Sequence, residues 1–210
     1  MTRFLAGGLL GTRYTLTTIG DGASVLIDAP EGIVSEVKEF LRETDTRLEA
    51  ILLTHGHFDH IAGLGELERE FGPLDVYLDQ RDEVFLTEGN EKIFSLPSFY
   101  GAKGYYTDKL SLFSGKTKRL EGKIFSFSVI HTPGHTPGSV VYYDEKNSIA
   151  YTGDTIFQGG GIGRTDMTYS SFSDEITSIR NIFSILGDDV MIVPGHGNNS
   201  TIGEERKYHN

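Results

Sequence analysis

Residues 48–60 run Leu48-Glu49-Ala50-Ile51-Leu52-Leu53-Thr54-His55-Gly56-His57-Phe58-Asp59-His60, and the rest of the chain is interpreted outward from them. The apolar part, up to Thr54, precedes a glycine turn and therefore predicts a buried strand. Three histidines and an aspartate follow within six residues, in a chain that has seven histidines in all. Imidazole nitrogens and carboxylate oxygens are the ligands that zinc, manganese and iron prefer. We therefore predict a metal site here, in preference to a polar loop that happens to be rich in histidine.

The composition is that of an ordinary globular protein. The 210 residues are 38% hydrophobic and 23% charged, and no linker or low-complexity segment divides them, so we predict one domain over residues 1–210. The formal net charge of −11 argues against a nucleic-acid partner, because that affinity depends on Lys and Arg contacts to phosphate. Without cysteine, any metal must be held by His, Asp or Glu.

Nothing in the sequence approaches the roughly 18–20 apolar residues of a membrane-spanning helix. The apolar residues 4–10 are not followed by the small-residue pattern of a signal-peptide cleavage site. We therefore expect a cytoplasmic protein without a membrane partner, and the lack of cysteine fits a reducing compartment.

Strand and helix signals alternate along the chain, which predicts an α/β fold. The turn Gly20-Asp21-Gly22 between two β-rich runs predicts a hairpin. The predicted strands cover residues 14–19, 23–27, 48–54, 74–78, 123–130, 139–143, 148–151 and 190–193. The predicted helices cover 32–43, a segment through Leu64, Leu67 and Phe71, and a segment carrying Phe172, Ile176, Ile179, Phe183 and Leu186.

Residues 88–118 show no clear period and are rich in aromatic residues. A long irregular stretch in a compact domain is often a lid over a binding site, and the alternative is a surface loop whose aromatic side chains pack on the core. If it is a lid, Tyr100, Tyr105 and Tyr106 are candidates for substrate contact, with Lys103 meeting an anionic group.

Three more candidate ligands each follow a predicted strand and a glycine. They are His135 after Pro133-Gly134, Asp154 after Gly153, and His196 after Pro194-Gly195. Ligands at separate strand ends can converge at one edge of a sheet, where α/β proteins place their sites. His131 ends a predicted strand shortly before His135, and we expect it to be structural or to support a ligand from behind. His209 lies next to the terminus, where disorder is the default expectation.

Together, His55-x-His57-x-Asp59-His60, Pro-Gly-His135, Gly-Asp154 and Pro-Gly-His196 resemble the motif set of the metallo-β-lactamase superfamily. The resemblance runs from Asp28 to the C-terminus. It implies an αβ/βα four-layer sandwich, in which two mixed β-sheets pack face to face with helices outside. It also implies a two-metal site at the sheet edges.

The resemblance assigns a role to each candidate ligand. The first metal would be held by His55, His57 and His135. The second would be held by Asp59, His60 and His196, with Asp154 bridging both. Asp28 would support a ligand histidine from behind. We expect two divalent cations, zinc first, with iron or manganese as alternatives because all three accept these ligands.

Such a site implies hydrolysis. Two cations roughly 3.5–4 Å apart can share a water and lower its pKa toward about 7, and Asp59 could orient that water or carry its proton. The chain has no Gly-x-Ser-x-Gly motif and no cysteine, so a protein nucleophile of the usual esterase kinds is not indicated.

Within the superfamily the chain resembles the glyoxalase II-like group, in particular its short single-domain bacterial members. Gly163-Arg164-Thr165-Asp166 and the segment Thr201–Glu205 support this, and they imply hydrolysis of a small thioester such as S-lactoylglutathione. An aspartate at 154, where the best-known β-lactamases carry cysteine, argues against antibiotic hydrolysis.

We expect no C-terminal helical domain of the kind that supplies glutathione contacts in full-length glyoxalase II. Arg164 could replace such a contact, or it could be a buried ion-pair residue with Asp166 or a helix carboxylate. The alternative activity is that of a mononuclear iron persulfide dioxygenase, with His135, Asp154 and His55 or His57 as ligands. The retained Gly195-His196-Gly197 favours two metals. The sequence does not indicate an oligomeric state.

Overall fold

A computed structural model describes residues 1–87, 109–115, 118–122 and 125–209. The chain divides into two compact units, Met1–Phe113 and Ser114–Asn210, and each is described by itself. Most of the predicted lid, including Tyr100, Lys103, Tyr105 and Tyr106, lies outside the described residues.

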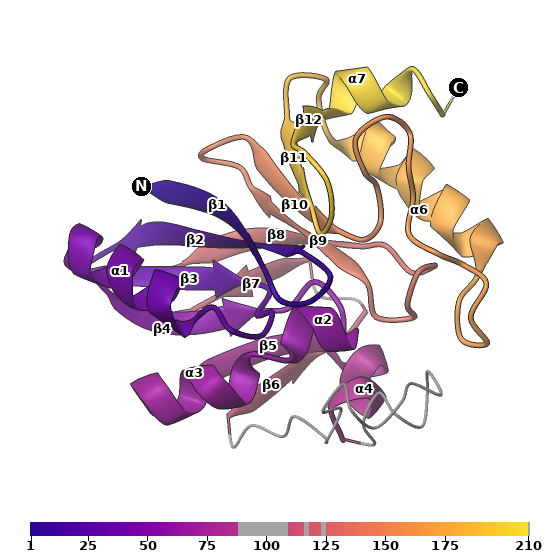
Figure 1. Ribbon diagram of the computed structural model, residues 1–210. Coiled ribbons are helices and arrows are strands. Elements are labelled where there is room, and N and C mark those ends of the chain that lie inside the picture. The colour runs from indigo at the N-terminus through magenta and orange to yellow at the C-terminus, as the bar shows by residue number, and fades with distance from the viewer. Residues whose placement is uncertain (88–108, 116–117, 123–124, 210) are drawn as a thin grey trace. The chain divides into compact units, whose positions relative to one another are not determined.

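The first unit contains a six-stranded mixed sheet in the order β1-β2-β3-β4-β5-β6 (Figure 1). Its strands are β1 Thr2–Gly7, β2 Thr12–Gly20, β3 Ala23–Ile27, β4 Arg47–Leu52, β5 Asp75–Asp79 and β6 Leu110–Phe113. The pairs β1–β2 and β2–β3 are antiparallel, and the pairs from β3 to β6 are parallel. The predicted hairpin is confirmed as β2–β3, with Asp21 and Gly22 in the left-handed conformation that its turn requires. The sequence analysis missed β1 and β6.

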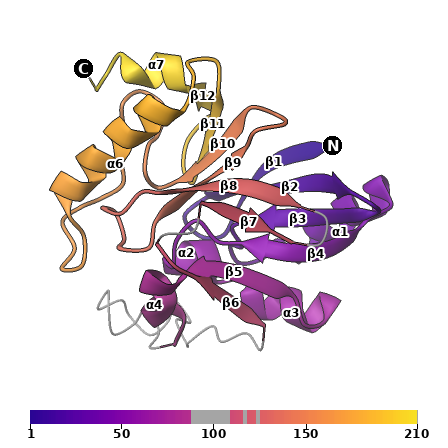
Figure 2. The ribbon, with the colours of Figure 1, turned by 180° about the vertical axis from the view of Figure 1, so that it is seen from behind.

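The first unit also holds α1 Val34–Thr44, α2 Phe58–Ile61, α3 Leu64–Phe71, η1 Gln80–Asp82 and α4 Glu83–Thr87. Helix α1 buries Val37, Phe40 and Leu41, the face that its helical spacing predicts. It contacts α3 and β2, and both α1 and α3 lie on one face of the sheet (Figure 1, Figure 2). Strand β4 lies between parallel neighbours, and its last three residues, Ala50, Ile51 and Leu52, form a buried apolar run.

The second unit contains another six-stranded mixed sheet, in the order β12-β11-β10-β9-β8-β7. Its elements are β7 Arg119–Glu121, β8 Ser126–His131, β9 Val140–Asp144, β10 Ile149–Gly153, α6 Phe172–Ile185, β11 Met191–Pro194, β12 Ser200–Thr201 and α7 Ile202–Arg206. The predicted hairpin at 139–151 is confirmed as β9–β10, while β10 and β11 are parallel. The sequence analysis missed β7, β12 and α7.

Ser171 caps the N-terminus of helix α6, where its side chain accepts the backbone N–H of Asp174 at 3.3 Å. Its Ile179 and Ile182 join a core cluster with residues of β8 to β11, among them Val141 and Ile192. Phe172 fits the apolar spacing but is 60% exposed, because it is the first residue of the helix. Within the described ranges, no helix combines the length and the apolar character needed to span a bilayer.

Candidate metal centre

The predicted ligands of the first unit follow β4 directly. His55 and His57 lie in the connection from β4, and His57 is the extended residue just before α2. Asp59 and His60 occupy the first turn of α2, where the N–H of His60 donates to the carbonyl of His57 at 2.9 Å. This strand-to-helix turn folds six residues tightly, so that the rings of His55 and His60 lie 4.1 Å apart.

Asp28, at the end of β3, supports two of these histidines. Its Oδ2 accepts a hydrogen bond from Nδ1 of His60 at 2.9 Å, and both groups are buried. Its carboxylate also accepts the Thr54 backbone N–H and hydroxyl, each at 2.8 Å. Because the Thr54 hydroxyl gives its single proton to Asp28, it accepts from Nδ1 of His55 at 3.1 Å. In both histidines Nδ1 thus points to the support, and Nε2 is the nitrogen that would face a metal.

A second buried carboxylate holds the backbone between His55 and His57. Asp82 in η1 is fully buried, and its Oδ2 accepts the N–H of Gly56 at 2.9 Å. The hydrogen bond satisfies a buried backbone donor and fixes the connection on which both histidines stand.

In the second unit, main-chain groups orient His135. Its Nδ1 donates to the carbonyl oxygen of Arg164 at 2.8 Å, so Nε2 is again the nitrogen for a metal. The approach requires glycine at 163, because a Cβ there would lie 2.1 Å from the carbonyl oxygen of Asp154 and 2.7 Å from the His135 ring. The Gly163-Arg164 pair of the motif thus acts through its backbone: glycine permits the close approach, and Arg164 supplies the carbonyl.

Glu175 in the first turn of α6 holds the backbone of His135. It is fully buried, and its Oε2 accepts the His135 N–H at 2.7 Å. Gly134 packs against it, since a Cβ at 134 would lie 2.2 Å from Oε2. Burial raises the pKa of Glu175 to about 8; the hydrogen bond from His135 opposes the rise, and the charge of Asp154 adds to it.

The donor atoms within each unit have the spacing of ligands around an ion. Oδ2 of Asp154 lies 3.5 Å from Nε2 of His135 and 3.6 Å from Nε2 of His196. Oδ2 of Asp59 lies 3.6 Å from Nε2 of His60. Nitrogen and oxygen ligands about 2.0–2.2 Å from a tetrahedral zinc are themselves roughly 3.3–3.6 Å apart. The donor set therefore fits divalent metal.

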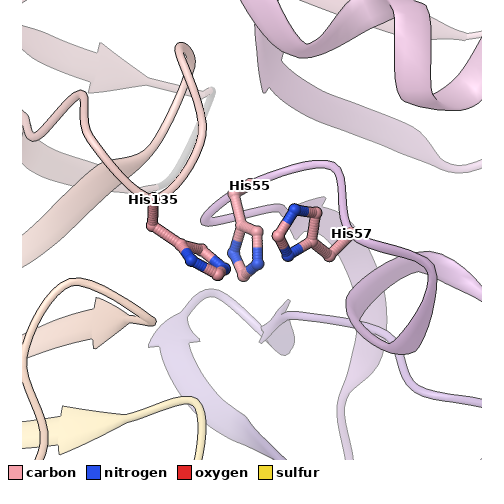
Figure 3. Close-up of side chains that lie close together, drawn as sticks. All are labelled: His55, His57 and His135. Carbon is pink, nitrogen blue, oxygen red and sulfur yellow. The ribbon is translucent and has the colours of Figure 1, made fainter. Parts of the chain in front are cut away.

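The candidate ligand atoms form three groups, within each of which all atoms lie within 4.8 Å of one another. The groups are His55, His57 and His135; His55, His60 and Asp154; and Asp59, His60 and His196. Figure 3 shows the side chains of the first group close together. All seven ligands expected from the sequence occur in these groups, and Asp154 shares one with histidines expected at different metals.

Of the predicted substrate residues, Arg164 is the one that lies in the described ranges. Arg164 pairs with Asp166 through two hydrogen bonds of 3.0 and 2.9 Å, the partner that the sequence analysis named. The expectation of a buried pair is wrong, because the two side chains are 75% and 66% exposed. The hydrogen bond from Arg164 lowers the pKa of Asp166.

Sequence reasoning missed the groups that hold the ligands in place. They are the hydroxyls of Thr12 and Thr54, the carboxylates of Asp82 and Glu175, and the carbonyl of Arg164. Glu175 left a signal, because it occupies a buried position of α6 in line with Ile179 and Ile182. An acidic residue on an apolar helix face needs a partner.

With this geometry in place, the class of the protein is defined. A family model described as the metallo-beta-lactamase superfamily matches residues 8–196, and the chain belongs to that family. The hydroxyacylglutathione hydrolase GloC of Haemophilus influenzae is 34% identical over 190 residues, covering 89% of this chain and 86% of that protein.

Two solved structures are also similar over nearly the whole chain. The B3 metallo-beta-lactamase BLEG-1 matches with a TM-score of 0.85 and 31% identity, covering 100% of this chain and 98% of that one. TTHA1623, described in a di-iron-bound form, matches with a TM-score of 0.80 and 27% identity, covering 98% of each chain. The predicted metallo-β-lactamase fold, with two mixed sheets and helices, is confirmed.

Proposed function

We propose that this chain is a binuclear metal-dependent hydrolase that cleaves a small thioester, such as S-lactoylglutathione, to a hydroxy acid and a thiol. The observation that carries the proposal is the set of three overlapping ligand groups, in which no position of the family's motif is missing. Membership of a hydrolase-containing superfamily supports the reaction type, and the similarity to GloC supports the thioester.

The proposed ligands are His55, His57 and His135 for one ion, Asp59, His60 and His196 for the other, and Asp154 for both. When bound, two divalent cations supply a hydroxide at neutral pH and polarise the substrate carbonyl. Zinc is the first choice, with iron or manganese as alternatives that the same nitrogen and oxygen donors accept.

The chain's own groups hold this site in one geometry. The Thr54 and Asp28 network fixes the ring orientation of His55 and His60, and the Arg164 carbonyl fixes that of His135. Asp59 is 11% exposed and is the proposed residue for orienting water or carrying its proton. Arg164 is well exposed beside its carbonyl and is proposed to meet the substrate's carboxylate-bearing thiol part.

The partner is therefore proposed to be a small thioester and not a nucleic acid, and the cytoplasmic location remains a prediction from the sequence. Contacts from Tyr100, Lys103, Tyr105 and Tyr106 are proposals from the sequence alone.

Elemental analysis with thioester assays tests the proposal. We expect about two equivalents of metal per chain and hydrolysis of S-lactoylglutathione that is lost with a chelator and restored by metal. A β-lactam belongs beside the thioester, because BLEG-1 is described as a β-lactamase. Faster turnover of the β-lactam would overturn the thioester assignment. One equivalent of iron, with oxygen uptake on glutathione persulfide, would replace the hydrolase with the dioxygenase.

The matched control for the ligand carboxylates is Asp189→Asn, at an exposed aspartate of the second unit. Asp189→Asn should keep two equivalents of metal and full activity, whereas Asp154→Asn should lose metal and activity. Equal effects of the two substitutions would contradict the assignment of Asp154.

A further inference from the structure

Thr12 makes a hydrogen bond that the family motifs do not predict. It begins β2 directly after the tip of the β1–β2 hairpin and is fully buried. Its Oγ1 donates to Oδ2 of Asp59 at 2.6 Å, across 47 residues of sequence. Because an ionised carboxylate only accepts, Thr12 must be the donor, and the length is typical of a hydroxyl bonded to a charged oxygen.

The oxygen that Thr12 contacts is the one placed as a ligand. Oδ2 of Asp59 also lies 3.6 Å from Nε2 of His60, too far for a hydrogen bond but close to the spacing of two ligands on one ion. The Thr12 hydroxyl therefore acts on the atom that would face the second metal.

The backbone holds this hydroxyl in position. Thr12 pairs with Gly7 in the β1–β2 ladder, so its main chain is fixed by strand pairing. Its β-branched side chain has few χ1 choices in a buried strand. Asp59, by contrast, lies in the four-residue helix α2, which has little stability of its own. The rigid strand thus orients a side chain on a weaker element.

We propose that Thr12 is a positioning residue for Asp59, selecting the carboxylate rotamer that directs Oδ2 to the second metal. The inference rests on the proposed binuclear site and names a residue on which that site depends. Outer-shell partners of this kind commonly contribute about 10–100-fold to metal affinity.

The test titrates metal-free wild-type protein, Thr12→Val and Thr12→Ser with Zn²⁺ in competition with a chelating dye. Valine keeps the shape without the hydroxyl, and serine keeps the hydroxyl. We expect the second equivalent to bind about 10–100-fold more weakly to Thr12→Val. The first equivalent should be unchanged, and Thr12→Ser should restore the second to within about threefold of wild type.

Thr17→Val is the matched control. Thr17 is a buried threonine of the same strand whose hydroxyl bonds to that of Thr2 at 2.8 Å. It should leave both zinc affinities unchanged. The double variant Thr12→Val/Asp59→Asn should bind zinc no more weakly than Asp59→Asn alone, because Thr12 acts through that carboxylate.

An unchanged affinity of Thr12→Val for the second zinc equivalent would overturn the inference. The proposed function would stay intact in that case, provided that the wild type binds two equivalents. Equal weakening of both equivalents, or additive losses in the double variant, would show a merely structural role and overturn it too. If Thr12→Val does not fold, failure of Thr12→Ser to hold the second equivalent as wild type does would be decisive against it. A wild type with fewer than two equivalents would overturn the proposed function, and the inference with it.

Discussion

The two units hold their ligand histidines by different means. In the first, side chains orient the histidine rings: Asp28 contacts His60 directly and His55 through Thr54. In the second, each contact to His135 involves one main-chain group: its ring donates to the Arg164 carbonyl, and its own backbone N–H donates to the Glu175 carboxylate. A side-chain support depends on one residue type, whereas a backbone carbonyl can come from any residue. Apart from substitutions of the ligands themselves, substitutions should therefore change metal affinity unequally at two loops, residues 55–60 of the first unit and residues 133–135 of the second.

Removing a ligand should have the largest effect and should not distinguish the loops. We expect His57→Ala and Asp154→Ala each to reduce kcat by more than about 100-fold, beyond the loss typical of outer-shell partners. The helices should be unaffected, because neither residue belongs to the core. Steady-state kinetics and far-UV circular dichroism measure both quantities. Full activity in either variant would rule out the binuclear mechanism.

Asp28→Asn tests the side-chain support of the 55–60 loop. Asn tolerates the left-handed conformation of residue 28, where φ is +60°, so the backbone should survive. The charge that orients His60 and Thr54 would be lost, and metal affinity should fall about 10–100-fold. Competition titration with zinc measures this. An affinity within twofold of wild type would show that Asp28 supports the turn alone.

Glu175→Gln tests the support of the 133–135 loop through the pH dependence of stability. The raised pKa, about 8 against an ordinary 4.5, means that the folded protein keeps a proton that the unfolded chain releases. Its contribution to stability is thus present below about pH 4.5 and is lost as pH rises toward 8. Glutamine keeps the acceptor for His135 without titrating.

In the metal-free protein, the wild type should therefore lose stability relative to Glu175→Gln over this window. Urea unfolding at several pH values measures the difference. A difference that does not change with pH would mean that Glu175 does not carry the raised pKa.

Arg164→Ala should have the smallest effect on the site. Alanine supplies the same carbonyl to His135, so metal affinity should be unchanged. Loss of the exposed ion pair with Asp166 should change stability little, because solvent screens the two charges. If the side chain meets the substrate, KM should rise while metal content stays constant. A loss of metal would show that the side chain, and not the carbonyl, supports His135.

The sequence predicts features that depend on local pattern better than contacts between distant residues. The β4 run, both hairpins and the ligand motifs were predictable because each depends on local side-chain pattern. The strand β6 was missed because its four residues lie in a stretch without clear periodicity, and β1 because its apolar run of three residues is short and ends at two glycines. Glu175 was missed although its place on an apolar helix face indicates that it needs a partner, because that pattern does not say which one. Thr12 and Asp82 were missed because each acts on a residue far along the chain. Single-sequence patterns carry no information on such pairs.

The attachment of the 133–135 loop to α6 has a consequence for motion. Besides the Glu175 bond, the Ser171 N–H donates to the Gly134 carbonyl at 2.8 Å, and the Ser170 and Ser178 hydroxyls donate to the carbonyls of His135 and Pro133. Detachment of the N-terminal half of α6 would break these bonds together. The His135 amide should therefore exchange with deuterium only when that half of the helix opens, and its exchange rate would report how often the loop and the helix separate.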